Sequence, residues 1–274
     1  MKIREVTKII FFLVPVIFLV GCNILLYKQK LSFQDVSNEI TRNDTVYIGL
    51  FYSGWKFDNL HESVSDYQYA YKVSLDDGMD HEKVAKQLSH FKIIESLIIA
   101  GLSKPIDTFP EPYSVLTGVE KIDLRSENIK FFPEEVTRMK SVTSVLISNN
   151  DLNNLCYSEL DILFKSLSYF ENLRFIGLAN NSLDTLPSSI QRIENLVTIN
   201  ISGNNFKTIP TGLGELNIRH IVIDYQPEIM NGDFFSVLKD LESVQIWFYE
   251  GSLQYKDYDL LKVIDEKYPS LDIS

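Results

Sequence analysis

The chain has little of the chemistry on which catalysis and metal binding depend. No glycine-rich phosphate loop and no nucleophile elbow occurs in its 274 residues. Its four histidines show no ligand spacing: His61, His81, His90 and His220. These absences argue against an enzyme, against a bound cofactor and against a metal site.

Positive charge is also in short supply. Lysine and arginine together number 26 against 37 aspartates and glutamates, which gives a formal net charge of −11 at pH 7. Nucleic-acid phosphates are bound by clustered lysine and arginine, so this balance argues against a nucleic-acid partner. It equally disfavours a domain that lies flat on anionic lipid.

Cysteine is nearly absent, with only Cys22 and Cys156 in the chain. If Cys22 is modified, as the leader described below indicates, no intramolecular disulfide is possible. We therefore expect Cys156 to be a buried structural thiol.

One acidic run, residues 76 to 80, hints at calcium binding. It lacks the alternating acidic positions and the distal glutamate of an EF-hand loop. A simpler interpretation is a turn over residues 76 to 78, followed by Asp80 as the cap of a helix. In that helix Val84, Leu88 and Phe91 would face the core.

What the chain does contain is one phrase, repeated between Val119 and Leu216. Each copy has apolar residues at relative positions 1, 4, 6 and 11, usually asparagine at 9, and an apolar–proline pair at 14 and 15. The copies that begin at Leu173 and Leu196 match it throughout. Extending the frame gives seven starts: Ile94, Val119, Val142, Leu173, Leu196, Ile218 and Leu241.

This phrase resembles the leucine-rich repeat, whose consensus is L-x-x-L-x-L-x-x-N-x-L. The resemblance implies an α/β solenoid of about seven coils over residues 94 to 249. Short parallel strands would line its concave face, helical or 3₁₀ segments its convex face, and caps its two ends. Leucine-rich repeats overwhelmingly serve protein interaction, so the resemblance also implies a non-catalytic binding protein.

Each repeated position has a physical reason. Side chains at positions 4 and 6 lie on one side of a strand and fill the core, which stacked coils make continuous. Asparagine at position 9 can satisfy inward-pointing backbone groups, so we expect a structural ladder of Asn150, Asn181 and Asn204. The other coils carry different residues there and should be less regular: Leu102, Glu127, Gln226 and Tyr249.

Proline at position 15 lacks an N–H and fixes φ, so it suits the first position of a helical turn. Phe109-Pro110, Phe132-Pro133, Leu186-Pro187 and Ile209-Pro210 follow this pattern. One coil is longer, with an insertion between Leu152 and Phe170 whose apolar spacing predicts a helix on the convex side. That helix is either a partner contact or a neutral insertion.

The N-terminus carries a second signal. Lys2, Arg4 and Lys8 precede twelve apolar residues and then Leu19-Val20-Gly21-Cys22, which resembles the lipobox of bacterial lipoproteins. The resemblance implies that residues 1–21 are a signal peptide and that Cys22 is acylated, with the domain outside the cytoplasm on the bacterial envelope. An uncleaved signal anchor is the alternative. No acidic retention residue follows Cys22, so an outer-membrane position is permitted.

The segments outside the repeats are expected to tether and cap the solenoid. Residues 22–43 are expected to be a lipid-anchored tether. Residues 44–93 are expected to form an N-terminal cap with strands at 46–52 and 68–75 and a helix at 80–91. Residues 250–274 are expected to form a C-terminal cap, with a helix at 258–268 and a partial strand at 271–273.

Strand alternation predicts the binding surface. If positions 4 and 6 face the core, positions 3, 5 and 7 face the concave side. The aromatic and polar side chains there, with one neighbour at position 8, are the candidate contacts: Phe175, His220, Asp224, Tyr225 and Trp247. The candidate ligand is a protein or peptide. The alternatives are a glycan-binding or structural envelope component, and a Trp247 that merely packs with Phe248 under the C-terminal cap.

Overall fold

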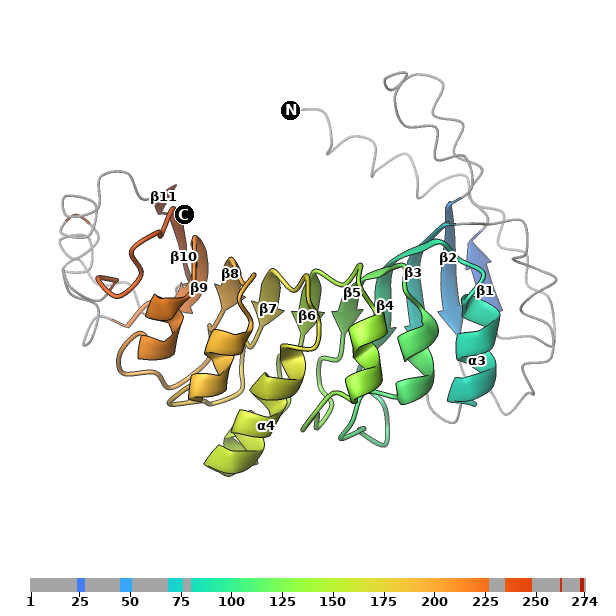
Figure 1. Cartoon of the computed structure of the whole chain (residues 1–274), viewed down its shortest axis with the longest axis horizontal. Helices are drawn as coiled ribbons and strands as arrows, with labels where there is room; N and C mark the ends of the chain where they lie inside the picture. The colour runs from blue at the N-terminus through green and yellow to red at the C-terminus, as the bar shows by residue number, and fades with distance from the viewer. Residues whose placement is uncertain are drawn as a thin grey trace, which may run out of the picture.

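The protein is built on a single sheet whose strands follow one another in chain order. In the computed structural model the described residues are 24–27, 45–50, 69–75, 80–226, 235–247, 262 and 272–273. Eleven strands pair from β1 to β11, and every pair is parallel except β1 with β2. They line the inner side of a shallow arc, with the helical segments along its outer side (Figure 1).

The elements have the following bounds. The strands are β1 Ile24–Tyr27, β2 Thr45–Leu50, β3 Tyr69–Leu75, β4 Ile93–Ile99, β5 Val119–Asp123, β6 Ser144–Leu146, β7 Phe175–Gly177, β8 Thr198–Asn200, β9 His220–Asp224, β10 Ser243–Trp247 and β11 Asp272–Ile273. The α-helices are α3 His81–Leu88 and α4 Tyr157–Leu167. The 3₁₀ segments are η2 Glu111–Val115, η3 Glu134–Arg138, η4 Leu152–Asn154, η5 Ser188–Arg192 and η6 Thr211–Glu215.

The core is the row of side chains that the repeat predicts. Every residue at positions 4 and 6 of the seven coils, from Leu97 to Ile246, is 5% exposed or less. On the convex side the aromatic rings of successive coils continue the packing: Phe132 lies 5.8 Å from Phe109 and 5.2 Å from Phe170 between ring centroids. Each coil therefore buries its apolar row only against its neighbours, as a solenoid requires.

The asparagine ladder is confirmed. Asn181 donates to the carbonyls of Ile147 and Leu178 and accepts from the backbone N–H of Asn150. Asn150 and Asn204 make equivalent bonds, and all three side chains are buried. The parallel sheet, the buried strand rows and this ladder make the chain a leucine-rich repeat solenoid.

Glu127 corrects the expectation that its turn is irregular. It is 1% exposed, and its two carboxylate oxygens accept from the backbone N–H groups of Leu102 and Ile106, both at 2.9 Å. The two N–H groups that it bridges are four residues apart in the chain, whereas the two that Asn204 bridges, those of Asn181 and Leu183, are two residues apart. The longer glutamate side chain reaches both, and the turn remains ordered.

The 3₁₀ segments on the convex side follow the four prolines, but each begins one residue later than expected. Pro110, Pro133, Pro187 and Pro210 are each the N-cap of a 3₁₀ segment rather than its first residue. At the N-cap the backbone is extended, which suits proline and leaves its missing N–H without consequence.

The insertion in the long coil forms α4, as its apolar spacing predicts. Leu160, Leu163, Phe164 and Leu167 are buried on one side of it. Cys156 at its N-cap is exposed, so the expectation of a buried thiol is wrong. The capping geometry is the reason, because an N-cap side chain stays at the helix end beside the first-turn N–H groups and not on the buried face.

The sheet continues past the first repeat on the N-terminal side. In β3 the buried Val73 and Leu75 pair in register with Leu97 and Ile99 of β4, and α3 follows on the convex side as the helix prediction requires. Asp80 caps α3 by accepting from the backbone N–H of Lys83. The described parts of residues 44–93 thus extend the repeat sheet on its N-terminal side.

Residues 24–27 form β1, antiparallel to β2, so this part of the expected tether belongs to the sheet. The leader with Cys22, the residues of the acidic run before Asp80, and most of the expected C-terminal cap lie outside the described residues. Of that cap, β11 pairs with β10 in parallel. Within the described ranges no helix is long and apolar enough to span a membrane.

Candidate functional site

The concave face of β7 to β10 is the candidate site, and register places two of its expected contacts in one row. Phe175 pairs with Thr198, Thr198 with His220, and His220 with Ser243. Strands lie about 4.8 Å apart, so Phe175 and His220 are roughly 10 Å from each other along this position-3 row. All four side chains are half-buried, and their other faces point to the concave surface.

His220 is held in place by its neighbour in this row. Its Nδ1 lies 2.8 Å from the Ser243 Oγ, a hydrogen bond that joins β9 to β10 across the concave face. The bond leaves the opposite edge of the imidazole ring available to a partner. His220 is therefore oriented before any ligand arrives.

Trp247 occupies the opposite end of β10 from the position-3 row. It is 53% exposed, although the bulk of an indole ring favours burial. It lies four residues from Ser243, which is about 13 Å along a strand. The structure therefore does not gather the candidate contacts into one patch. It sets Phe175 and His220 on one side of the concave face and Trp247 on the other.

Two of the candidate contacts are corrected by the structure. Tyr225 is 7% exposed and belongs to the core, so the expectation that it stands beside Trp247 is wrong. Asp224 is 5% exposed, and its carboxylate accepts the backbone N–H of Gly203 in the preceding coil. Both side chains serve the packing of the last coils and are not available to a partner.

The backbone at position 8 explains the burial of Tyr225. Four of the other coils have a left-handed residue there: Gly101, Ser126, Asn149 and Asn180. Gly203, in the next coil, is also left-handed at φ +68°, and a Cβ on it would lie 1.9 Å from the Asn180 Oδ1. A bulky tyrosine disfavours this region, and Tyr225 does not adopt it. Its side chain is buried in the core.

A polar hollow borders His220 at the amino ends of the strands. It has a volume of about 390 Å³ and is lined by Arg174, Arg219, Glu194 and Glu242, among others. Arg219 Nη1 lies 3.0 Å from Glu242 Oε1, and both side chains are about half exposed. Sequence reasoning missed both arginines. Their common position 2 in the repeat, one residue before Phe175 and His220, was the available signal.

The rest of the concave face carries little charge. Asp123, 3% exposed, is bonded by the guanidinium of Arg125 through both oxygens, at 2.9 and 2.8 Å. That bonding raises the pKa of Arg125 above its usual value. In the centre Gly177 has no side chain, and a Cβ there would meet Leu146 at 2.6 Å. The middle of the face is consequently flat and uncharged.

In the described part of the chain, no group of three histidine, cysteine or carboxylate side chains is placed to hold a metal ion. The concave face instead presents rigid strands, two aromatic side chains, an oriented imidazole and a polar hollow. These are groups that bind through contact and hydrogen bonds.

Comparison with known proteins yields likenesses of fold. No protein-family model and no curated protein matches the sequence. An internalin C2 from Listeria monocytogenes has a TM-score of 0.41 and 13% identity, over 69% of this chain and 76% of that one. The leucine-rich repeat protein LegL7 from Legionella pneumophila has a TM-score of 0.47 and 15% identity, over 76% and 75%.

A third likeness is to a much longer chain. The mouse RP105/MD-1 complex has a TM-score of 0.46 and 14% identity, and the match covers 67% of this chain but 31% of that one. The solenoid assignment rests on the chain's own sheet, buried strand rows and asparagine ladder.

Proposed function

We propose that this protein is a non-catalytic recognition module of a bacterial envelope, which binds a protein or peptide on the concave face of its solenoid. The observation that carries the proposal is the exposed Trp247 on β10, in the same sheet as the oriented His220 on β9 and Phe175 on β7. Large aromatic side chains on a rigid surface, beside small residues, are typical of the energetic centre of a protein interface.

The position-3 row supports an extended or loop-like partner segment. The row crosses four strands, and the polar hollow with Arg174 and Arg219 runs beside it. An apolar side chain of the partner would contact Phe175, while its carboxylate or carbonyl groups would meet the guanidinium groups of the hollow. Trp247 would contact the partner on the far side of the face.

Affinity capture from the native envelope tests this proposal. The full chain is compared with a variant in which Phe175→Ala, His220→Ser and Trp247→Ser are combined. A matched control carries Ile162→Ser, because Ile162 is 54% exposed on α4, away from the sheet. We expect the concave variant to lose the captured partner and the control to retain it. An unchanged capture profile in the concave variant would overturn the proposal.

A glycan is the second candidate ligand, since exposed tryptophan also stacks on sugars. A single variant, Trp247→Ser, is therefore assayed both for retention on purified cell-wall polysaccharide and for protein capture, with Ile162→Ser again as the control. If Trp247→Ser abolishes polysaccharide retention while protein capture is unchanged, the ligand is a glycan and not a protein.

We further propose that Cys22 carries the membrane anchor. The basic residues, the apolar stretch and Leu19-Val20-Gly21-Cys22 support this proposal. Two or more acyl chains hold a protein durably, because each buried CH₂ contributes about 0.8 kcal/mol. Metabolic labelling with an alkyne fatty acid should mark the chain, and Cys22→Ser should abolish the label. If the chain is unlabelled yet stays in the membrane with residues 1–21 attached, it is an uncleaved anchor.

A further inference from the structure

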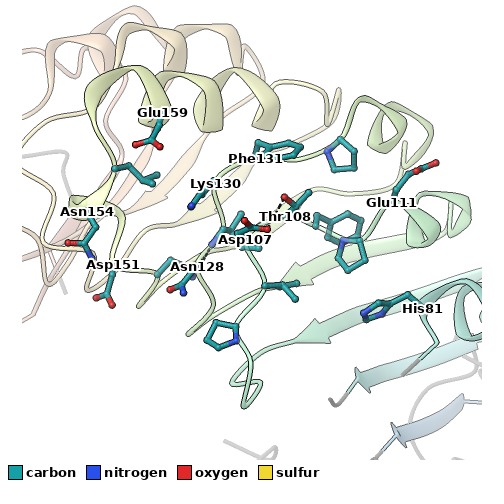
Figure 2. Close-up of a pocket in the computed structure, with 18 residues that line it drawn as sticks. His81, Asp107, Thr108, Glu111, Asn128, Lys130, Phe131, Asp151, Asn154 and Glu159 are labelled. Carbon is teal, nitrogen blue, oxygen red and sulfur yellow. Dashed lines mark hydrogen bonds between the residues drawn. The ribbon is translucent and has the colours of Figure 1, made fainter. Parts of the chain in front are cut away.

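A second hollow, far larger than the one beside His220, lies on the flank of the solenoid. This flank groove has a volume of about 1080 Å³ and runs across the loops that follow β4, β5 and β6, with His81 of α3 and Glu159 of α4 also in its lining. Its axis crosses three coils, and Figure 2 shows Phe131 and Lys130 between the wall with Glu159 and Asp151 and the wall with Glu111. It is separate from the concave face.

The insertion creates this groove. The flanks of the first two coils are joined by main-chain bonds, from Asn128 N to Ile106 O at 3.0 Å and from Lys130 N to Asp107 O at 2.7 Å. In the third coil the chain turns away through η4 into α4. There α4 reaches back with one side chain, as Ser166 Oγ accepts from Phe132 N at 2.9 Å. The floor of the groove, which the first two coils form, is therefore held together by main-chain bonds. The wall that α4 forms is joined to it through a side chain.

Phe131 is an anomaly at the floor of the groove. It is the residue before the apolar–proline pair, and at that place three other coils have threonine: Thr108, Thr185 and Thr208. Phe131 is 41% exposed, while the adjacent Phe132 is fully buried in the core. Core packing therefore does not require an aromatic side chain here, and the solvent disfavours one.

The rim of the groove is acidic. Asp107, Glu111, Asp151 and Glu159 line it, against a single ammonium group from Lys130. The backbone N–H of Cys156, with a smaller contribution from Lys130, holds the pKa of Glu159 below its usual value, so this carboxylate stays ionised. Acidic groups around an exposed ring match a cation that carries an apolar stem, because a guanidinium can both pair with the carboxylates and stack on the ring.

We propose that the flank groove is a second binding surface, which takes a basic segment of a partner protein with an apolar or aromatic side chain next to its arginines or lysines. The apolar side chain packs on Phe131, and the cationic groups meet the carboxylates of the rim. Charge separates this surface from the concave face, whose centre is uncharged.

Fluorescence anisotropy with defined peptides tests the proposal on the full chain in mild detergent. The probe is a labelled peptide of about ten residues that alternates arginine with leucine. Two comparison probes replace every arginine by glutamate or every leucine by serine. We expect the first probe to bind, the serine probe to bind at least about tenfold more weakly, and the glutamate probe not to bind.

Two variants of the groove are matched by one control. Phe131→Thr installs the residue that the other coils have, so it should fold, as a thermal melt will show. A triple variant, Asp107→Asn with Asp151→Asn and Glu159→Gln, keeps the hydrogen-bond acceptors and removes three charges. The control removes three charges from exposed positions outside the groove and outside the polar hollow, by Asp184→Asn, Glu215→Gln and Asp240→Asn.

Both groove variants should weaken binding of the arginine–leucine probe at least about tenfold, and the control should change it less than about twofold. Equal loss in the control triple would mean non-specific attraction to an acidic protein and would overturn the proposal. No binding by the unchanged chain would also overturn it. If Phe131→Thr instead converts a dimer to a monomer in sedimentation, the occupant is a second copy of the chain, and the proposal is wrong. None of these results depends on the concave face.

Discussion

In the turns, single side chains join neighbouring coils by hydrogen bonds to backbone groups of the next coil. Asn181 satisfies one N–H and two carbonyl groups on two coils with a buried amide. Glu127 performs the same task with two carboxylate oxygens. In each case the length of the side chain matches the separation of the backbone groups that it bonds. Different residue types can therefore fill this position if their length fits.

Asn181→Ala should destabilise the solenoid strongly. It leaves the buried N–H of Asn150 and the carbonyl of Ile147 without the side-chain amide, while the Leu178 carbonyl keeps its bond from Asn204. Each unsatisfied group costs about 1–3 kcal/mol, so we expect a loss of roughly 3 kcal/mol in the free energy of unfolding. Chemical denaturation followed by circular dichroism measures it. Asn205→Ala is the control, because Asn205 is exposed and bonds only the Ser182 carbonyl through its side chain at 3.2 Å; its effect should stay within about 0.5 kcal/mol. Equal effects of the two variants would contradict the ladder.

The imidazole of His81 gives a pH-dependent prediction. His81 Nδ1 lies 2.8 Å from the hydroxyl of the fully buried Tyr113, and burial lowers the pKa of His81 from its ordinary value of 6.5, against the opposing effect of Asp80. A lowered pKa means that the neutral form is favoured in the folded state. Its stabilising contribution is therefore present above pH 6.5 and is lost as the pH falls through the folded pKa.

His81→Gln removes this titration. We expect the stability of the unchanged chain relative to the variant to decrease as the pH is lowered from about 7.5 to about 5.5. Denaturation midpoints of both proteins across that range provide the measurement. A stability difference that does not vary with pH would show that His81 titrates alike in the folded and unfolded states.

Among the elements, α4 does more than fill the convex side. It supplies Ser166 to the backbone of the preceding coil, and it stands at one wall of the flank groove. Phe170, three residues after its end, joins the aromatic core. Its helical form could be predicted from apolar spacing. Its contact with Phe132 could not, because nothing in the local sequence tells which distant N–H a buried serine will meet.

Ser166→Ala measures how much the hydrogen bond between α4 and the second coil contributes to stability. The substitution leaves the buried N–H of Phe132 unsatisfied, so we expect a loss of about 1–2 kcal/mol in the free energy of unfolding. Ser168→Ala is a matched control on the same helix end, since Ser168 also donates to the carbonyl three residues back but accepts nothing from another coil. A loss no larger than that of the control would mean that the contact contributes nothing to stability.

Taken as a whole molecule, the strands and the core were predictable and the surfaces were less so. Periodicity defines which side of a strand is buried, so the rows from Leu97 to Ile246 and the asparagine ladder follow from sequence alone. The exposure of Tyr225 could not be predicted, because it depends on whether the turn after β9 is left-handed. That of Asp224 could not be predicted either, because it depends on the bond to the Gly203 N–H in the preceding coil. Cys156 was misjudged because capping, not hydrophobicity, sets its place.

The concave face and the flank groove divide the molecule into two surfaces of different character. The concave face offers aromatic side chains and a polar hollow on rigid strands. The groove offers one exposed ring among carboxylates. If the solenoid serves recognition, its partners contact the concave strands in the cell.

Photo-crosslinking in the producing cell tests that claim most directly. A benzophenone side chain is placed at Gln245 or Thr198 on the concave strands, and at Arg192 on the convex side as a control. We predict that irradiation yields a discrete adduct with another protein from the two concave positions and none from Arg192. Adducts from Arg192 alone, or none from either concave position, would contradict the account.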